Sequence, residues 1–137
     1  MRILLADDSS LILERIQNIV SKFKQVEIVG SCKTGVETLD ALRRLKPDFT
    51  IVDINMPGLS GLDVLKEIRK ENKILKFLIL TFYASENYRQ IAMQSGADFF
   101  LSKVDDFEKL PKVIEKLLID ENPPNGNKTY MHSDDIN

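Results

Sequence analysis

Five short apolar runs alternate along the chain with longer stretches of helical periodicity, and this alternation limits the possible folds more than any other feature. The runs, rich in leucine and β-branched residues, are 2–6, 26–31, 49–54, 77–81 and 98–101. The helical stretches are 11–23, 35–45, 62–70, 86–95 and a last one that begins at about Pro111. Strands that alternate with amphipathic helices form a parallel sheet with helices on both faces. The pattern therefore predicts an α/β fold with a five-stranded parallel sheet.

The chain has 137 residues, which is enough for one domain with its own core. From about residue 121 the composition changes to Pro, Gly, Asn and Asp, with Tyr130, Met131 and Ile136 as the few large apolar side chains. Such a segment buries too little surface to order itself. We expect one folded domain over residues 1–120 and a mobile polar tail over 121–137, with His132 of the tail in solvent.

Charge and cysteine content exclude several classes of protein. The 19 basic and 21 acidic side chains leave a formal charge of −2, which offers no basic footprint for nucleic acid. Cys32 is the only cysteine, so there is no internal disulfide, and we expect it to be a small strand-end residue. The first apolar run is too short for a signal peptide or a membrane span. We expect a cytoplasmic protein that neither binds nucleic acid directly nor inserts into a membrane.

Acidic, hydroxyl and basic side chains stand where the predicted strands end. Asp7 and Asp8 follow the first strand, Asp53 lies at the end of the third, Thr81 ends the fourth, and Lys103 follows the fifth. The carboxyl ends of parallel strands meet at one edge of the sheet, where such folds bind ligands. Three neighbouring carboxylates repel one another unless a cation joins them, and Mg²⁺ prefers oxygen ligands. A carboxylate is also a competent nucleophile towards phosphorus, so the set suits phosphoryl transfer.

Residues 1 to about 118 resemble the receiver domain of two-component response regulators. The matching motifs are the acidic pair at 7–8, the run Asp-Ile-Asn-Met-Pro-Gly at 53–58 followed by Gly61, Thr81, and Gly-Ala-Asp at 96–98 leading to Lys103. The resemblance implies a flavodoxin-like three-layer (β/α)5 fold with strand order 2-1-3-4-5. It also implies a switch that changes the surface of its fourth helix, fifth strand and fifth helix towards a partner protein not yet known. Because the sequence encodes no output domain, we expect a stand-alone receiver.

Carried over position by position, the resemblance makes Asp53 the phosphoacceptor. Asp8, Asp53 and the carbonyl of Asn55 become direct Mg²⁺ ligands, with Asp7 acting nearby through water. The phosphoryl group would come from a sensor histidine kinase or a histidine phosphotransfer protein. The protein would then be a signalling phosphoacceptor and not an enzyme with an external substrate.

The same resemblance assigns the switch. Lys103 pairs with the phosphoryl group, Thr81 is the switch hydroxyl, and Phe100 is the switch aromatic that follows it. Asn55 and Tyr83 stand where the family steers the water that hydrolyses the aspartyl phosphate.

Two positions depart from the family pattern. The residue after the switch hydroxyl is often small in receivers, whereas this chain has Phe82, and we predict that its ring restricts access to Asp53. Many receivers have a cis proline after the lysine, whereas this chain has Val104. A non-proline cis bond costs about 2.5–4 kcal/mol, so we expect a trans bond there.

Taken singly, each site residue has a plainer interpretation. Asp7 and Asp8 could cap the first helix, Asp53 could belong to a turn, and Thr81 and Lys103 could be an ordinary strand residue and a surface residue. Their joint position at one sheet edge favours the site. Elsewhere, the charged residues at 67 and 69–71 indicate a solvated helix face, Gly61 a tight turn, and the neighbours at 99 and 100 opposite sides of a strand.

Three other functions remain open at this stage. A phosphatase with an aspartyl-phosphate intermediate would use a similar edge, but it usually has a second acid two residues after the nucleophile, where Asn55 stands. A binding module that has lost phosphorylation is a second alternative, which Phe82 keeps open. A third is a receiver cut from a longer DNA-binding regulator, since the sequences at 81–83 and 99–103 resemble receivers that precede helix-turn-helix domains.

Overall fold

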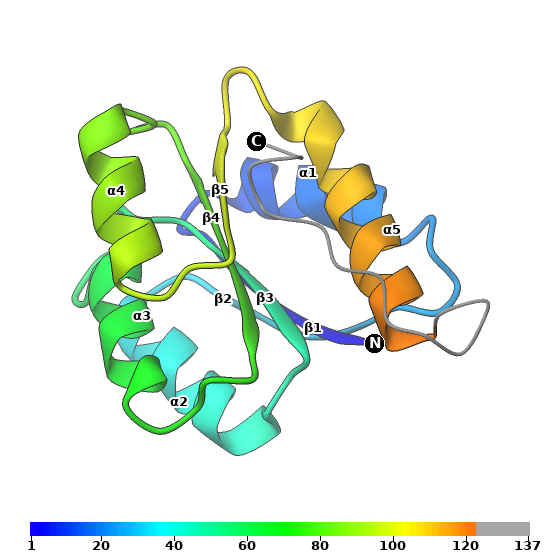
Figure 1. Ribbon diagram of the computed structural model, residues 1–137, viewed down its shortest axis with the longest axis horizontal. Coiled ribbons are helices and arrows are strands. Elements are labelled where there is room, and N and C mark those ends of the chain that lie inside the picture. Colours follow the sequence, from blue (N-terminus) through cyan, green and yellow to red (C-terminus); the bar gives the residue numbers. More distant parts are fainter. Residues whose placement is uncertain (123–137) are drawn as a thin grey trace.

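The computed structural model describes residues 1–122, which form a parallel sheet covered by helices on both faces (Figure 1). The strands are β1 (Arg2–Ala6), β2 (Glu27–Cys32), β3 (Phe49–Val52), β4 (Lys76–Thr81) and β5 (Phe99–Ser102). The helices are α1 (Ser10–Val20), α2 (Gly35–Leu45), α3 (Gly61–Arg69), α4 (Glu86–Gln94) and α5 (Leu110–Glu121), with a 3-10 turn η1 (Phe107–Lys109) before α5. The strand order is β2-β1-β3-β4-β5 and all neighbours are parallel, which confirms the predicted fold and order.

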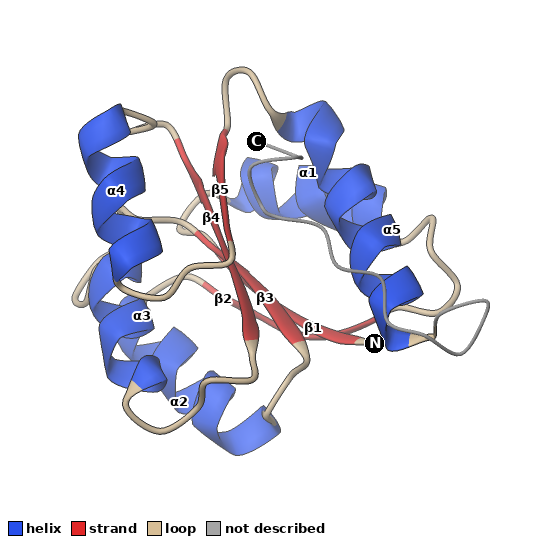
Figure 2. Cartoon of the chain, viewed as in Figure 1, coloured by secondary structure: helices blue, strands red, loops and turns tan. Residues whose placement is uncertain are grey.

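The two faces of the sheet carry separate apolar cores. Helices α1 and α5 cover one face, and α2, α3 and α4 cover the other (Figure 2). Along β1, Ile3 and Leu5 face α1 and α5, while Leu4 and Ala6 face the other layer. A strand buried on both faces is apolar almost throughout, which explains the apolar runs in the sequence, and the buried Thr50 of β3 donates its hydroxyl hydrogen to the Leu4 carbonyl at 2.9 Å. Phe99 and Phe100 are buried on opposite faces, as predicted.

Four helices begin with a hydroxyl cap at the carboxyl edge of the sheet. Each cap oxygen accepts a hydrogen bond from the backbone N–H three residues later, at 3.1–3.3 Å. The caps are Ser9, Thr34, Ser60 and Ser85. Because Ser9 caps α1, the plainer interpretation of Asp7 or Asp8 as the cap is wrong. The caps start α1 to α4 at one sheet edge, so their N-termini surround the candidate site.

Several predicted boundaries shift by a few residues. Helix α1 ends at Val20, three residues early, and β3 ends at Val52, so Asp53 follows the strand. Helix α5 starts at Leu110, which makes Pro111 its second residue. The two ends of β5 each move by one residue, and Cys32 is the buried last residue of β2, as expected. These shifts leave the order of elements unchanged.

The predicted domain boundary meets the end of the described chain. Helix α5 runs to Glu121, one residue beyond the boundary predicted at 120. The rest of the predicted tail, including His132, lies outside the residues described. Within residues 1–122, no helix is long and apolar enough to span a bilayer.

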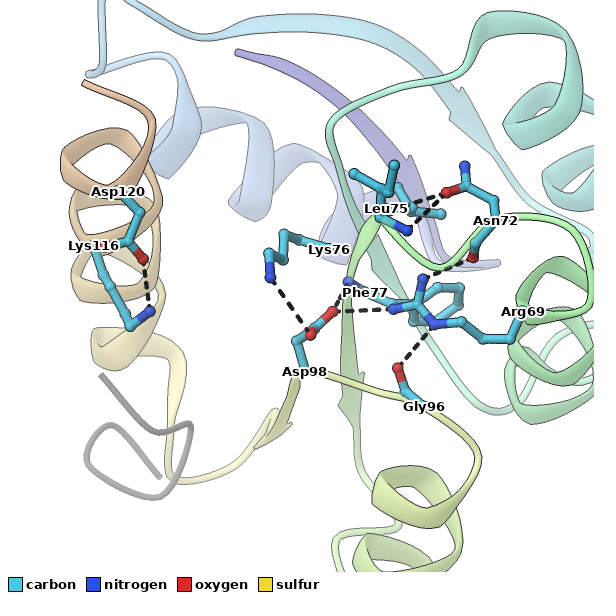
Figure 3. A network of polar contacts seen from close by, with 10 residues as sticks. Arg69, Asn72, Leu75, Lys76, Phe77, Gly96, Asp98, Lys116 and Asp120 are labelled. Carbon is cyan, nitrogen blue, oxygen red and sulfur yellow. Dashed lines mark hydrogen bonds and ion pairs between the residues drawn. The ribbon is translucent and has the colours of Figure 1, made fainter. Parts of the chain in front are cut away.

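Arg69 joins three segments at the amino edge of the sheet, so its expected place on a solvated helix face is wrong (Figure 3). Its guanidinium donates to the carbonyls of Gly96 and Asn72 at 3.0 and 3.1 Å. It also donates to the Asp98 carboxylate at 3.1 Å. The same carboxylate accepts a hydrogen bond from the Phe77 N–H at 2.8 Å. The guanidinium therefore ties the end of α3 to the start of β4 and to the turn before β5.

Two glycines hold the loop that follows β3, residues 53–60. A Cβ atom on Gly61 would lie 2.0 Å from the backbone carbonyl oxygen of Asp53. A Cβ atom on Gly35 would lie 2.0 Å from the carbonyl oxygen of Leu59, and the Gly35 N–H donates to the Pro57 carbonyl at 3.2 Å. Gly61 is therefore required for close approach to the backbone, and not for the tight turn expected from the sequence.

Replacement of Gly61 by alanine should destabilise the domain, because the new methyl group meets rigid backbone. We expect the free energy of unfolding to fall by roughly 3 kcal/mol, the upper part of the usual range for overpacking. Urea denaturation followed by circular dichroism measures it. The control is Gly30→Ala, whose Cβ would first meet a movable Leu4 methyl at 3.0 Å. Equal losses in the two variants would contradict the backbone explanation.

Candidate functional site

The structure brings the predicted strand-end residues together. Hydrogen bonds continue the sheet one residue past the strands: the Asp7 N–H donates to Cys32 at 3.0 Å, and the Asp53 N–H donates to Ala6 at 2.9 Å. The Lys103 N–H donates to the carbonyl oxygen at the end of β4 at 2.9 Å. These bonds fix the backbone from which the site side chains project.

Lys103 bridges two of the aspartates. Its Nζ atom lies 2.5 Å from Asp7 Oδ2 and 3.2 Å from Asp53 Oδ2. The side chains of Lys103 and Asp7 are 2% exposed and that of Asp53 is 7% exposed. The second oxygen of Asp7 accepts the Ser9 N–H at 2.9 Å, so both Asp7 oxygens have partners. Two carboxylates and one ammonium are thus buried as a group.

The Asp53 carboxyl has a raised pKa, chiefly because burial disfavours its charged form. Lys103 opposes this by attracting the charge, Asp7 adds to it by repulsion, and the backbone N–H of Asn55 lowers the pKa through a hydrogen bond. Burial outweighs the favourable contacts. Keeping Asp53 ionised in this site therefore costs free energy, and a bound cation would reduce that cost.

The acidic cluster matches the donor set of a hard divalent cation. Asp7, Asp8 and Asp53 each place one carboxylate oxygen within 4.8 Å of the others. Asp8 is exposed, so one side of the cluster meets solvent. Three carboxylates and the Lys103 ammonium sum to −3 + 1 = −2, which one Mg²⁺ ion neutralises. The residues fit the metal predicted from the sequence.

The segment after β4 places three further predicted residues. Thr81 is fully buried and its hydroxyl accepts the Tyr83 N–H at 3.0 Å. The Tyr83 side chain is exposed, and Phe82 is 59% exposed. The Phe82 ring centroid lies 4.9 Å from Lys103 Nζ, so the ring faces the site.

Phe100 and Val104 complete the predicted set. Phe100 is buried in the core beneath α2, α3 and α4. No cis peptide occurs among residues 1–122, which confirms the trans bond expected before the exposed Val104. The Asn55 side chain is exposed beside Asp53.

Two contacts at the site were missed from the sequence. Gly35 appeared only as the start of a helix, although it supports the loop after Asp53. The contact between Phe82 and Lys103 was also missed. Each contact joins segments far apart in the chain, so no local pattern could signal it. The two aromatic residues that follow Thr81, Phe82 and Tyr83, were the local signal in the sequence for aromatic rings near the site.

The fold and the site define a doubly wound α/β domain with a lysine-bridged acidic cluster at its ligand-binding edge. The family model of the response regulator receiver domain matches residues 3–115. The chain therefore belongs to the receiver domains of two-component response regulators. Receiver domains take phosphoryl groups from histidine kinases and bind Mg²⁺ at their acidic phosphorylation site.

Curated relatives with different names match this chain over part of their length. The chain is 32% identical over 116 residues to the uncharacterized transcriptional regulatory protein YvfU of Bacillus subtilis strain 168, covering 85% of this chain and 58% of that protein. It is 37% identical over 105 residues to a protein-glutamate methylesterase/protein-glutamine glutaminase of Methanospirillum hungatei JF-1, covering 75% and 31%. The chain thus spans little more than half of one relative and about a third of the other.

Solved structures share the fold. The response regulator domain of Thermotoga maritima CheB superposes with a TM-score of 0.77 at 28% identity, covering 86% of this chain and 93% of that one. The isolated receiver domain of RcsB from Salmonella enterica serovar Typhimurium, solved with phosphomimetic BeF3−, gives a TM-score of 0.81 at 21% identity, covering 99% and 97%. At that identity the second likeness supports the fold alone.

Replacement of Asp53 by asparagine should stabilise the metal-free domain at neutral pH. The folded-state pKa of Asp53 is raised above its unfolded value. The raised pKa means that the folded state is most stable when the carboxyl is protonated, below the unfolded-state pKa. This stability is lost as the pH rises through the folded-state pKa, because the buried carboxyl must then ionise. The Asn variant avoids this loss, and Lys103 keeps its contact with Asp7. We expect a gain on the order of 1 kcal/mol at neutral pH that shrinks in acid.

Chemical denaturation of both proteins at several pH values, without divalent cations, measures this difference. Asp40→Asn, at an exposed carboxylate of α2, is the control and should change little. A destabilised Asp53→Asn protein at neutral pH would contradict the predicted sign.

Proposed function

We propose that this receiver domain accepts a phosphoryl group on Asp53 from a phosphohistidine and uses it to change its binding to a partner protein. The observation that carries the proposal is the buried Asp53 carboxylate, bridged by Lys103 to Asp7 and clustered with Asp8. Asp7 is the other buried carboxylate of this cluster, and both its oxygens already have partners, the Lys103 ammonium and the Ser9 N–H.

In the proposed reaction, an Asp53 carboxylate oxygen forms a bond to phosphorus while the nitrogen–phosphorus bond of phosphohistidine breaks. The bonding electrons stay on the imidazole, which is released neutral after taking a proton from solvent. Lys103 would pair with the incoming phosphoryl oxygens, which its distance of 3.2 Å from Asp53 Oδ2 supports. The buried hydroxyl of Thr81 is the second donor of the site.

Asp7, Asp8 and Asp53, together with the Asn55 carbonyl, would hold Mg²⁺, as proposed from the sequence. When bound, the ion would supply positive charge against the carboxylates and the phosphoryl oxygens. The side chains of Asn55, two residues after Asp53, and of Tyr83, two residues after Thr81, are exposed. We assign them to the steering of the water that later hydrolyses the aspartyl phosphate.

The rim of the site supports a protein as the phosphoryl donor. Large apolar side chains are exposed on the segments that follow the strands at this edge: Leu11, Val36, Phe82, Tyr83 and Val104. Such residues surrounding an acidic centre suit a partner that presents its phosphohistidine from an apolar surface. A sensor histidine kinase or a histidine phosphotransfer protein can present a phosphohistidine from an apolar surface. A small phosphodonor would not contact the exposed apolar side chains around the site.

The proposed response runs through the segment after β4. Thr81 would exchange its bond with the Tyr83 N–H for one with the phosphoryl group, and Phe100 would follow. Phe100 is already buried, so phosphorylation would not move an exposed ring into the core. It would instead shift the population between two conformations in which Phe100 packs differently. The affected surface is that of α4, β5 and α5.

Replacement of Asp53 by asparagine should abolish labelling by small phosphodonors, because the nucleophilic oxygen is lost. Intact mass, measured with Mg²⁺ and acetyl phosphate, should rise by one phosphoryl group in the wild type and in the Asp40→Asn control, and not in Asp53→Asn. Size-exclusion chromatography of the labelled wild type reports the oligomeric state. An unchanged size would favour a monomer that seeks a partner, and persistent labelling of Asp53→Asn would refute the assignment.

Replacement of Phe82 by alanine should open the site to small molecules, because the ring lies beside Lys103 at its mouth. We expect labelling by acetyl phosphate and loss of the label to be faster by about two- to tenfold, equivalent to roughly 0.4–1.4 kcal/mol in each barrier. Rates come from mass spectra taken over time. Equal rates in the two proteins would show that the ring does not restrict access.

A further inference from the structure

Phe82 combines two properties that do not usually occur together. Its side chain is largely exposed, yet the face of its ring lies against an ammonium group that is almost fully buried. The separation of 4.9 Å between Lys103 Nζ and the ring centroid lies within the range of roughly 6 Å for a cation–π contact. The neighbouring Tyr83 makes its ring contact with Tyr88 instead, at 6.3 Å. The two adjacent aromatic residues therefore have different surroundings.

The ring of Phe82 is a third neighbour of the Lys103 ammonium. Asp7 and Asp53 pair with Nζ, and Phe82 presents the negative face of its π system to it. Without the ring, water would reach the ammonium, and the long lysine side chain could move its charge towards solvent. The ring thus favours the position of Nζ between the two carboxylates.

That position bears directly on cation binding. Asp7 and Asp53 are bridged by Lys103 and also contribute oxygens to the acidic cluster with Asp8. An ammonium held between them occupies carboxylate oxygens and repels a second cation. The firmer its hold, the weaker a divalent cation should bind.

We propose that Phe82 is a positioning residue that holds the Lys103 ammonium between Asp7 and Asp53 through its ring face, and thereby weakens divalent cation binding at the acidic cluster. The part that concerns the cation rests on the proposed function, whereas the placement of the ammonium does not. This role is separate from restricted access, because access depends on bulk and the ammonium contact depends on an aromatic face.

Three variants separate the aromatic face from bulk. Phe82→Leu keeps an apolar side chain without a π system, Phe82→Tyr keeps the ring, and Tyr88→Leu makes the same kind of loss at a nearby aromatic residue of α4. Phe82 and Tyr88 are exposed, so the fold should persist, which thermal unfolding checks. The first measurement follows exchange of the Lys103 ammonium protons with water by NMR in the absence of metal, and Lys103→Met identifies the signal.

The second measurement is a calorimetric titration with Mg²⁺ alone. In Phe82→Leu we expect ammonium exchange to be about two- to fivefold faster and the Mg²⁺ dissociation constant to be about two- to fivefold lower, the range set by an exposed cation–π contact. Phe82→Tyr and Tyr88→Leu should match the wild type in both measurements.

The outcomes distinguish the positioning of Lys103 by Phe82 from its effect on cation binding. If Phe82→Leu matches the wild type in ammonium exchange, the ring acts only as bulk and the positioning role is overturned. If exchange accelerates but Mg²⁺ affinity stays unchanged, the effect on cation binding is overturned. If the wild type binds no Mg²⁺, the proposed metal site fails and the cation part falls with it, while the exchange measurement still decides the positioning of Lys103.

Discussion

A buried ammonium shared by Asp7 and Asp53 is the interaction on which the carboxyl edge of the sheet depends. Removing such groups from water costs several kcal/mol per ion, which only close contacts offset. Lys103 supplies those contacts at 2.5 and 3.2 Å. The backbone must therefore bring the ends of β1, β3 and β5 to fixed positions. The bonds that extend the sheet past each strand, together with the close approach of Gly61 to Asp53, keep them there.

The two edges of the sheet are built for different tasks. At the amino edge, Arg69 and Asp98 use their polar atoms to tie α3, β4 and the turn before β5 together. At the carboxyl edge, burial raises the pKa of Asp53 and large apolar side chains remain exposed around it. The amino edge therefore carries contacts that join the elements of the fold, and the carboxyl edge carries the candidate site.

The family relationship limits what can be transferred to this chain. One relative is named a transcriptional regulatory protein and another a methylesterase, and each matches only part of its length. A shared receiver domain is thus compatible with different outputs. What is common is the phosphoryl chemistry at the sheet edge, whereas the surface of α4, β5 and α5 selects the partner in our proposal. In this chain the ring of Phe82 lies against the Lys103 ammonium at that edge.

Local patterns were enough to predict the elements and the edge at which the site lies. Apolar runs of strand length, helical periodicity and the acidic residues after strands act within a few residues of the chain, so they can be recognised directly, whereas the hydroxyl caps of α1 to α4 were not predicted. The strand order came from the resemblance to a known family. Tertiary structure alone decided that Asp53 is buried, that Gly35 supports its loop, that Arg69 is no surface charge and that Phe82 covers Lys103. These contacts join segments distant in sequence, and their existence depends on how helices and strands pack in three dimensions.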